Sequence, residues 1–180
     1  FSFDLTANGQ VLGMAGGDDG NQSWGCAATV NAIALLPDGR TFIGGDFGGV
    51  NGIPRMNYAR LNADGGVDRS FDSSWGADGE IVSVARETDG AILILGNFSL
   101  VNAVPCSNLA RIKPDGTVDT AFRPAFAFRE EWRPMNEVVV QPDGKILVCG
   151  AFTNVNGVAR CSLARLHGDG TLDETFNAAS

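Results

Sequence analysis

The sequence has no cluster of lysine and arginine residues. Its 13 basic residues stand against 21 acidic ones, which leaves a net charge of −8 at pH 7. The phosphate backbone of a nucleic acid or an anionic membrane surface would repel such a chain. Nucleic acid is therefore excluded as an expected partner.

Long hydrophobic runs are also missing. Apolar runs such as residues 91–95 and 138–140 are far shorter than the roughly 20 apolar residues that a membrane-spanning helix needs. We therefore expect no membrane insertion. The chain starts at Phe1 without a methionine or a basic segment followed by an apolar one, so we expect a processed chain or an excised domain.

Histidine is scarce, and cysteine lacks the spacing of a metal site. His167 is the single histidine, and no serine or cysteine stands near it in sequence together with an acidic partner. The four cysteines show no CxxC spacing, which argues against a zinc or thioredoxin-type site. They are Cys26, Cys106, Cys149 and Cys161. The sequence therefore predicts no enzyme, no metal and no cofactor.

The chain does contain a threefold internal repeat. Phe71, Phe122 and Phe176 mark its register, with an interval of 51 residues (122 − 71) and then one of 54 (176 − 122). Five further positions keep one residue type in all three copies: Asp38, Asp89 and Asp143; Gly45, Gly96 and Gly150; Phe47, Phe98 and Phe152; Arg60, Arg111 and Arg165; Asp68, Asp119 and Asp173. Repetition of this kind indicates a scaffold built from one supersecondary unit.

The repeat divides the chain into a single domain with three units. We place unit 1 at residues 21–71, unit 2 at residues 72–122 and unit 3 at residues 123–176. Residues 1–20 precede them, and Asn8-Gly9 between two apolar stretches predicts a hairpin or half unit there.

Each unit has the pattern of four short strands. In unit 1, apolar stretches at residues 33–36, 41–44, 58–62 and 67–71 are separated by turn signals and by one glycine-rich loop. Asp-Gly between such stretches is typical of a type I′ turn, in which both central residues have positive φ. No stretch has the periodicity of an amphipathic helix of useful length. The predicted fold class is all-β.

Two strings that recur in the units suggest a family. In unit 3 they read QPDGKILVCGAFTNVNG and LARLHGDGTLDETF. They resemble the bacterial delta-60 repeat, which implies that each unit is a blade of a β-propeller. Unit 2 departs most from the pattern, with Thr88 in place of proline and Ala103 in place of glycine. The resemblance also implies a secreted or cell-surface bacterial protein, so we expect an extracellular location.

Three units are too few to close a propeller, which usually needs four to eight blades. We therefore expect an incomplete ring. Either the chain belongs to a longer repeat array, or copies associate as a homo-oligomer and complete the ring between them. Three units of four strands also fit a β-trefoil, which is the alternative fold.

The repeated arginine and aspartate are expected to serve the scaffold. Each arginine lies between apolar neighbours on a strand, and a buried guanidinium needs a carboxylate. Because one aspartate such as Asp68 accompanies each arginine such as Arg60, we predict an Arg–Asp ion pair in every unit. A ring of anion-binding arginines is the alternative. The first aspartate of each DGxxD string is expected to form a turn and not a calcium loop, since Lys113 precedes it in unit 2.

Positions shared by all units describe the scaffold, so a specific function should lie in the connections, where the units differ. Our candidate ligand-binding residues are Trp132, Arg129, Glu130, Trp75 and Phe128. A tryptophan on a loop suits sugar stacking or protein contact. The alternative for Trp75 is that it closes the core between units. We expect a binding or adhesion module that recognises glycan or protein, with a structural assembly unit as the alternative.

The cysteines do not follow the repeat. Cys106 and Cys161 lie one register position apart in equivalent loops of units 2 and 3, and could form a disulfide if those loops converge. Cys149 replaces an aliphatic strand residue and is expected to be buried. These features fit an oxidising compartment.

Overall fold

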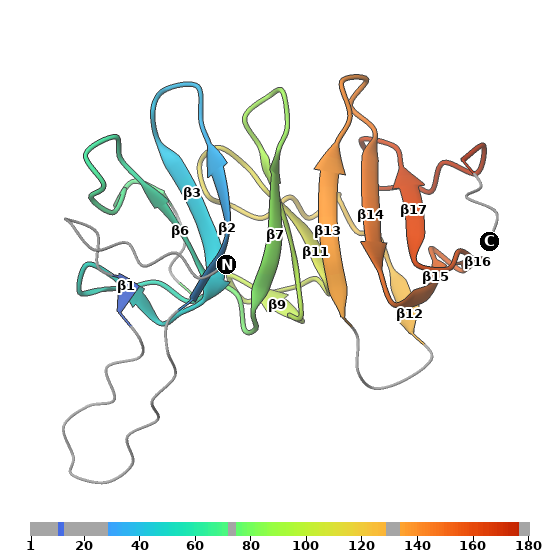
Figure 1. The fold of residues 1–180 in the computed structure, drawn as a ribbon, viewed down its shortest axis with the longest axis horizontal. Coiled ribbons are helices and arrows are strands. Elements are labelled where there is room, and N and C mark those ends of the chain that lie inside the picture. Colours follow the sequence, from blue (N-terminus) through green and yellow to red (C-terminus); the bar gives the residue numbers. More distant parts are fainter. Residues whose placement is uncertain (1–10, 13–28, 72–74, 129–133, 177–180) are drawn as a thin grey trace, which may run out of the picture.

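The units form a row of separate antiparallel sheets. The structure is a computed structural model that describes residues 11–12, 29–71, 75–128 and 134–176. These residues form strands and turns without a helix, which confirms the all-β prediction, and the ring is not closed. Figure 1 shows the sheets of units 1, 2 and 3 standing side by side, from blue through green to orange. Within the described ranges, no helix is long and apolar enough to cross a membrane.

Each unit contributes one main sheet of three antiparallel strands, with the second strand in the centre. Unit 1 contains β2 (Thr29–Leu35), β3 (Thr41–Asp46) and β6 (Tyr58–Leu61). Unit 2 contains β7 (Ile81–Arg86), β8 (Ile92–Gly96) and β11 (Leu109–Ile112). Unit 3 contains β13 (Met135–Val140), β14 (Ile146–Gly150) and β17 (Leu163–Leu166). The fourth strand of each unit is reduced to one bridge, Leu61 to Val67 in unit 1.

The loop after each central strand, predicted in unit 1 as a glycine-rich loop, contains a short hairpin. These hairpins are β4 (Gly49–Val50) with β5 (Ile53–Pro54), β9 (Leu100–Val101) with β10 (Val104–Pro105), and β15 (Phe152–Val155) with β16 (Val158–Ala159). An upstream segment pairs with each hairpin: β1 (Val11–Leu12) with β4, Ala77 with β9, and β12 (Phe126–Phe128) with β15. The rest of the hairpin predicted at residues 1–15 lies outside the described residues.

The Asp-Gly turns are three-residue loops, so the predicted type I′ geometry is wrong at these positions. In Pro37-Asp38-Gly39 only the glycine has positive φ, at 83°. The N–H of Gly39 donates to the carbonyl of Leu36 at 3.1 Å, and the Asp38 carboxylate accepts from the N–H of Arg40 at 3.1 Å. This carboxylate holds the aspartate in place, so the left-handed residue falls on the glycine alone.

Type I′ geometry occurs instead at the tips of the short hairpins. Asn51 and Gly52 both have positive φ, at 51° and 74°, and Asn156 and Gly157 repeat the pattern at 51° and 82°. Unit 2 has alanine at the second position, so Ala103 takes a φ of 61°. A Cβ in this region meets the following carbonyl, which costs roughly 1–2 kcal/mol.

The two larger clusters of buried apolar residues lie between units, and a smaller one that includes Ile43, Phe47 and Ala59 lies within unit 1. The main sheet of unit 1 packs Phe42, Tyr58 and Phe71 against Ile81 and Ile94 of unit 2. The sheet of unit 2 packs in the same way on unit 3, through a cluster that includes Leu93, Leu109, Phe122, Val148 and Leu166. Five of the six repeated phenylalanines are buried, which confirms them as core anchors; Phe176, on unit 3, is partly exposed.

We expect Ala103→Gly to stabilise the protein. The substitution removes the strain of a left-handed alanine but adds freedom to the unfolded chain, so the net gain in unfolding free energy is about 0.5–1 kcal/mol. Urea denaturation followed by circular dichroism measures it. Gly157→Ala is the matched control, because no atom lies within 4 Å of an added Cβ there, and it should lose a similar amount. Equal stability of all three proteins would contradict the assignment.

Candidate functional site

The repeated arginine and aspartate form an ion pair in every unit, as predicted. Arg60 Nε lies 2.9 Å from Asp68 Oδ2, and Arg165 Nε lies 2.9 Å from Asp173 Oδ2. In unit 2 the corresponding Arg111–Asp119 distance is 3.4 Å. Each pair joins the third strand to the segment that follows the last turn, so it fixes the end of the unit.

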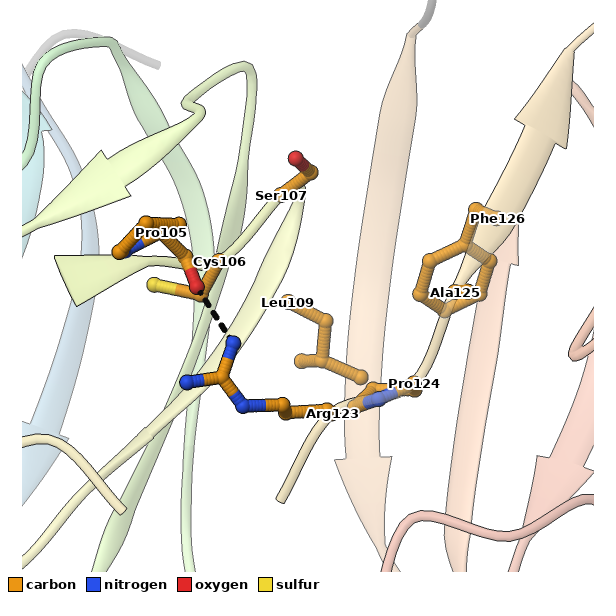
Figure 2. A pocket seen from close by; sticks show the side chains of 8 residues that line it. All are labelled: Pro105, Cys106, Ser107, Leu109, Arg123, Pro124, Ala125 and Phe126. Carbon is orange, nitrogen blue, oxygen red and sulfur yellow. Dashed lines mark hydrogen bonds between the residues drawn. The ribbon is translucent and has the colours of Figure 1, made fainter. Parts of the chain in front are cut away.

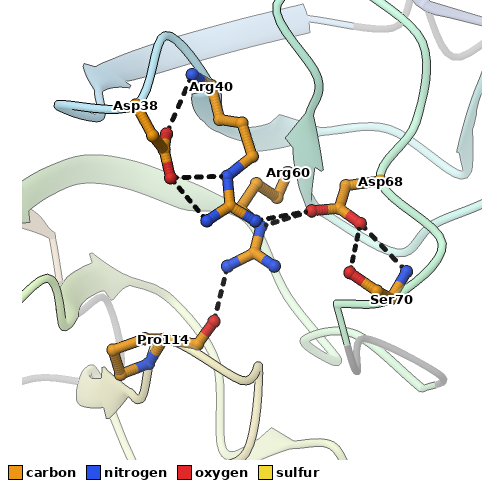
Figure 3. A network of polar contacts seen from close by, with 6 residues as sticks. All are labelled: Asp38, Arg40, Arg60, Asp68, Ser70 and Pro114. Carbon is orange, nitrogen blue, oxygen red and sulfur yellow. Dashed lines mark hydrogen bonds and ion pairs between the residues drawn. The ribbon is translucent and has the colours of Figure 1, made fainter.

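Units 1 and 3 add a second cation to the pair. Arg40 lies 3.0 Å from Asp68, and Lys145 lies 3.1 Å from Asp173. Figure 3 shows Arg40 and Arg60 converging on Asp68, whose other oxygen accepts from the Ser70 N–H and hydroxyl. One buried carboxylate therefore serves two cations in these units.

In unit 2 one cation lies between two carboxylates, the reverse of units 1 and 3. The position of Arg40 and Lys145 is occupied by Ala91, so the second cation is missing. Glu87 instead accepts two bonds from Arg111, at 2.6 Å from Nε and 2.9 Å from Nη2. Arg111 thus keeps a close carboxylate partner although Asp119 lies farther away.

The repeated guanidinium groups also stack on the repeated phenylalanines. Arg60 lies 4.2 Å from the ring centre of Phe71, and Arg111 lies 4.1 Å from that of Phe122. Cation–π contact adds to the ion pair. The repeated polar residues are therefore bonded to one another as scaffold, and the first aspartate of each DGxxD string forms a turn as predicted.

The hydrogen bonds hold the carboxyl groups of Asp68 and Asp173 ionised. Burial by itself would raise the pKa of Asp68, but bonds from Ser70, Arg40 and Arg60 outweigh it and bring the pKa far below its usual value. At Asp173 the hydroxyl of Thr175 and the two cations of unit 3 have the same effect on the pKa.

The predicted ligand-binding residues fall in two connections. Trp75 lies in the connection between units 1 and 2 and is 73% exposed, so the alternative that it closes the core is wrong. Phe128 ends β12 and packs, partly buried, against the core between units 2 and 3. Trp132, Arg129 and Glu130 lie outside the described residues.

A pocket of about 320 Å³ opens where the connection between units 2 and 3 leaves unit 2. Figure 2 shows it between the 105–109 segment and the 123–126 segment. Arg123 donates from Nη1 to the Pro105 carbonyl at 3.0 Å and from Nε to the Thr120 carbonyl at 2.8 Å. The lining of the pocket is mostly apolar. Pro105, Leu109, Pro124 and Phe126 surround the single charged side chain, Arg123.

Trp75 and this pocket occupy equivalent places in successive connections. Asn102 exchanges two hydrogen bonds with the backbone of Gly76, and Asn156 exchanges the same two with Ala125. Trp75 immediately precedes Gly76, just as Pro124 in the pocket lining precedes Ala125. The two features therefore belong to the same end of neighbouring units.

The described cysteines are free thiols. Cys106 and Cys161 are not joined, so the disulfide considered from their register is not formed. Cys149 is half-buried, less than expected, because it faces away from unit 2. Burial raises the pKa of the Cys106 thiol at the edge of the pocket. Cys26 lies outside the described residues.

Sequence reasoning named Phe128 in this connection but missed the pocket. Pro105 and Leu109 lie inside unit 2 and not in the connection, and only the fold brings them against Arg123. One sequence signal could have indicated the pocket. Arg123 begins the connection between units 2 and 3, which differs in length from the connection between units 1 and 2. Across the described part of the chain, no three His, Cys, Asp or Glu side chains are grouped so that they could hold a metal ion.

We expect Asp68→Ala to destabilise the protein more than Asp119→Ala. The first leaves two guanidinium groups, one of them buried, without their shared carboxylate, which costs about 3 kcal/mol. The second leaves Arg111 with Glu87 and should cost about 1 kcal/mol. Urea unfolding of both variants measures the difference, and an equal or reversed order would contradict the charge balance described for unit 2.

Stability should also fall at acidic pH. The folded pKa values of Asp68 and Asp173 lie below the unfolded value of about 3.9, so their contribution is complete above that pH and is lost as the pH falls below it. Melting temperatures between pH 2 and pH 6 measure this loss. The double variant Asp68→Asn/Asp173→Asn should show a shallower dependence, and an unchanged slope would count against the assignment.

Comparison with known families agrees with the repeat and the sheets. The family model described as "Domain of unknown function (DUF5122) beta-propeller" matches three times, at residues 36–71, 87–122 and 141–176. The intervals between these matches equal those of the internal repeat, and the description of the family as a β-propeller confirms the propeller prediction over the trefoil. No curated protein matches the chain. The chain therefore belongs to the DUF5122 β-propeller family.

Proposed function

We propose that the chain is a non-catalytic binding module that recognises a protein or glycan through the connections between its units. The supporting observation is the position of the exposed Trp75 and of the pocket beside Arg123, which occupy equivalent places where the units differ. The repeated arginine and aspartate side chains form ion pairs with each other. The connections are therefore the part of the surface that can differ in specificity while the scaffold stays constant.

The chemistry of the two features suits a ligand with an apolar body and a polar edge. The indole of Trp75 offers a flat face for a sugar ring or an apolar side chain. The pocket offers Leu109 and Phe126 as apolar walls, and Arg123 can donate to a carbonyl or carboxylate of the ligand. Trp132, Arg129 and Glu130 of the same connection remain candidates. The proposed setting is a secreted or cell-surface bacterial protein.

Substitution of Trp75 tests the proposal. A glycan array and a random peptide library are screened with the wild type, and the ligands recovered are titrated against Trp75→Ala, Arg123→Ala and Trp132→Ala. We expect a loss of affinity of tenfold or more for Trp75→Ala or Arg123→Ala, since contact residues at the centre of an interface commonly cost more than 1.4 kcal/mol.

Leu35→Ala is the matched control for Trp75→Ala, because Leu35 is an apolar residue of similar exposure, at 74%. Arg86→Ala, at another exposed arginine, is the control for Arg123→Ala. Unchanged binding by all three site variants, or an equal loss in the controls, would contradict the proposal. Recovery of glycans alone or peptides alone decides the class of ligand.

One observation favours a second candidate, the structural assembly unit. The face of unit 3 that points away from unit 2 exposes 44% of Val139 and 36% of Leu163. The corresponding faces of units 1 and 2 are buried by the next unit. In this second function the chain contributes blades to a larger propeller.

A further inference from the structure

Both junctions inside the chain are closed by the same hydrogen bond. Arg60 of unit 1 donates from Nη1 to the Pro114 carbonyl of unit 2 at 2.5 Å, as Figure 3 shows. Arg111 of unit 2 donates to the carbonyl of Gly168 in unit 3. Pro114 and Gly168 hold the same position in their turns, 54 residues apart (168 − 114). Arg60 and Arg111 therefore each join the aspartate of their own unit to the last turn of the next unit.

The side chains beneath this bond are also equivalent. Tyr58 on unit 1 is 0% exposed and Leu109 on unit 2 is 1% exposed, each covered by the following unit. On unit 3 the residue in that register is Leu163, which is 36% exposed. We call the surface formed by Val139, Leu147, Cys149, Leu163 and Arg165 the outward face of unit 3.

Arg165 makes the contacts of its two counterparts within its own unit. It pairs with Asp173 at 2.9 Å and lies 4.6 Å from the ring centre of Phe176, so its position within unit 3 matches that of Arg60 and Arg111. Among the described residues, no main-chain carbonyl outside unit 3 accepts a hydrogen bond from it. The guanidinium of Arg165 therefore has the position from which Arg60 and Arg111 bond to the next unit, but no described residue takes the place of Pro114 or Gly168.

The inward face of unit 1 is covered at its centre. Its central residues Ile43 and Ala59 are 1% and 0% exposed within the chain itself. Ile33 and Leu35 of β2 lie on the same face and are 44% and 74% exposed. Unit 1 of a second copy therefore offers only this edge, and not the uncovered centre that units 2 and 3 present at the internal junctions.

We infer that the outward face of unit 3 docks a fourth unit of the same repeat, joined through a connection like residues 123–135, whose last turn accepts the hydrogen bond of Arg165. This inference rests on the assembly role proposed as the second function. The fourth unit presents a turn carbonyl at the position of Pro114 and Gly168. It covers Leu163 and Cys149 with aliphatic residues in the register of Ile94 and Val148.

A tandem duplication tests the inference. A copy of residues 123–176 is inserted directly after Phe176, with the copied Cys149 changed to leucine as in unit 2. Iodoacetamide alkylation of the original Cys149 is followed by peptide mass spectrometry, with Cys106 as the internal reference. We expect alkylation at least tenfold slower than in the 180-residue chain, because the fourth unit covers Cys149. Arg165→Met in the duplicated chain should raise the alkylation rate of the original Cys149 several-fold, whereas Arg86→Met should leave that rate unchanged.

Three outcomes would overturn the inference. The first is an unchanged rate at Cys149 in a folded four-unit chain, and the second is failure of the added unit to fold, since the same residues fold against unit 2. The third is protection in the 180-residue chain that grows with concentration as its mass doubles in light scattering. The third result would show that a second copy covers the outward face of unit 3, and it leaves the assembly role intact. If Cys149 is protected neither in the four-unit chain nor in the 180-residue chain, the assembly role is contradicted as well.

Discussion

The fold depends on the packing of one unit on the next. A three-stranded sheet with apolar residues on both faces cannot bury them alone, and the two larger buried clusters of the described residues lie between units. The arginine bridge gives this packing a register. Arg60 and Arg111 each connect an aspartate in their own unit to a turn carbonyl in the next unit, so the sheets stack in one alignment.

Unit 2 shows how the scaffold tolerates change at this bridge. It lacks the second cation, yet Glu87 accepts two bonds from Arg111 and keeps the guanidinium bonded to carboxylates. The same unit places Ala103 in a left-handed conformation where the other units have glycine. Both departures occur in the middle unit, whose two faces are covered by neighbours.

The connections combine fixed geometry with variable content. Asn102 and Asn156 tie them to the short hairpins through the same pair of backbone bonds. That anchor places Trp75 and the residues around Arg123 at one end of the sheets whatever their identity. A binding surface built in this way can change its side chains without disturbing the clusters between units, which is the physical basis of the proposed function.

The sequence by itself determined the repeat, its register, the all-β class, the buried phenylalanines and the Arg–Asp pairs, because residues that serve the scaffold recur at fixed intervals. It misassigned the Asp-Gly turns, since the aspartate carboxylate selects a three-residue loop by a contact that dipeptide identity does not reveal. Only the tertiary structure decided that Trp75 is exposed, that Arg123 borders a pocket and that, among the described residues, Arg165 has no main-chain acceptor beyond its unit. These properties depend on which segments of neighbouring units meet, and each involves residues far apart in the chain.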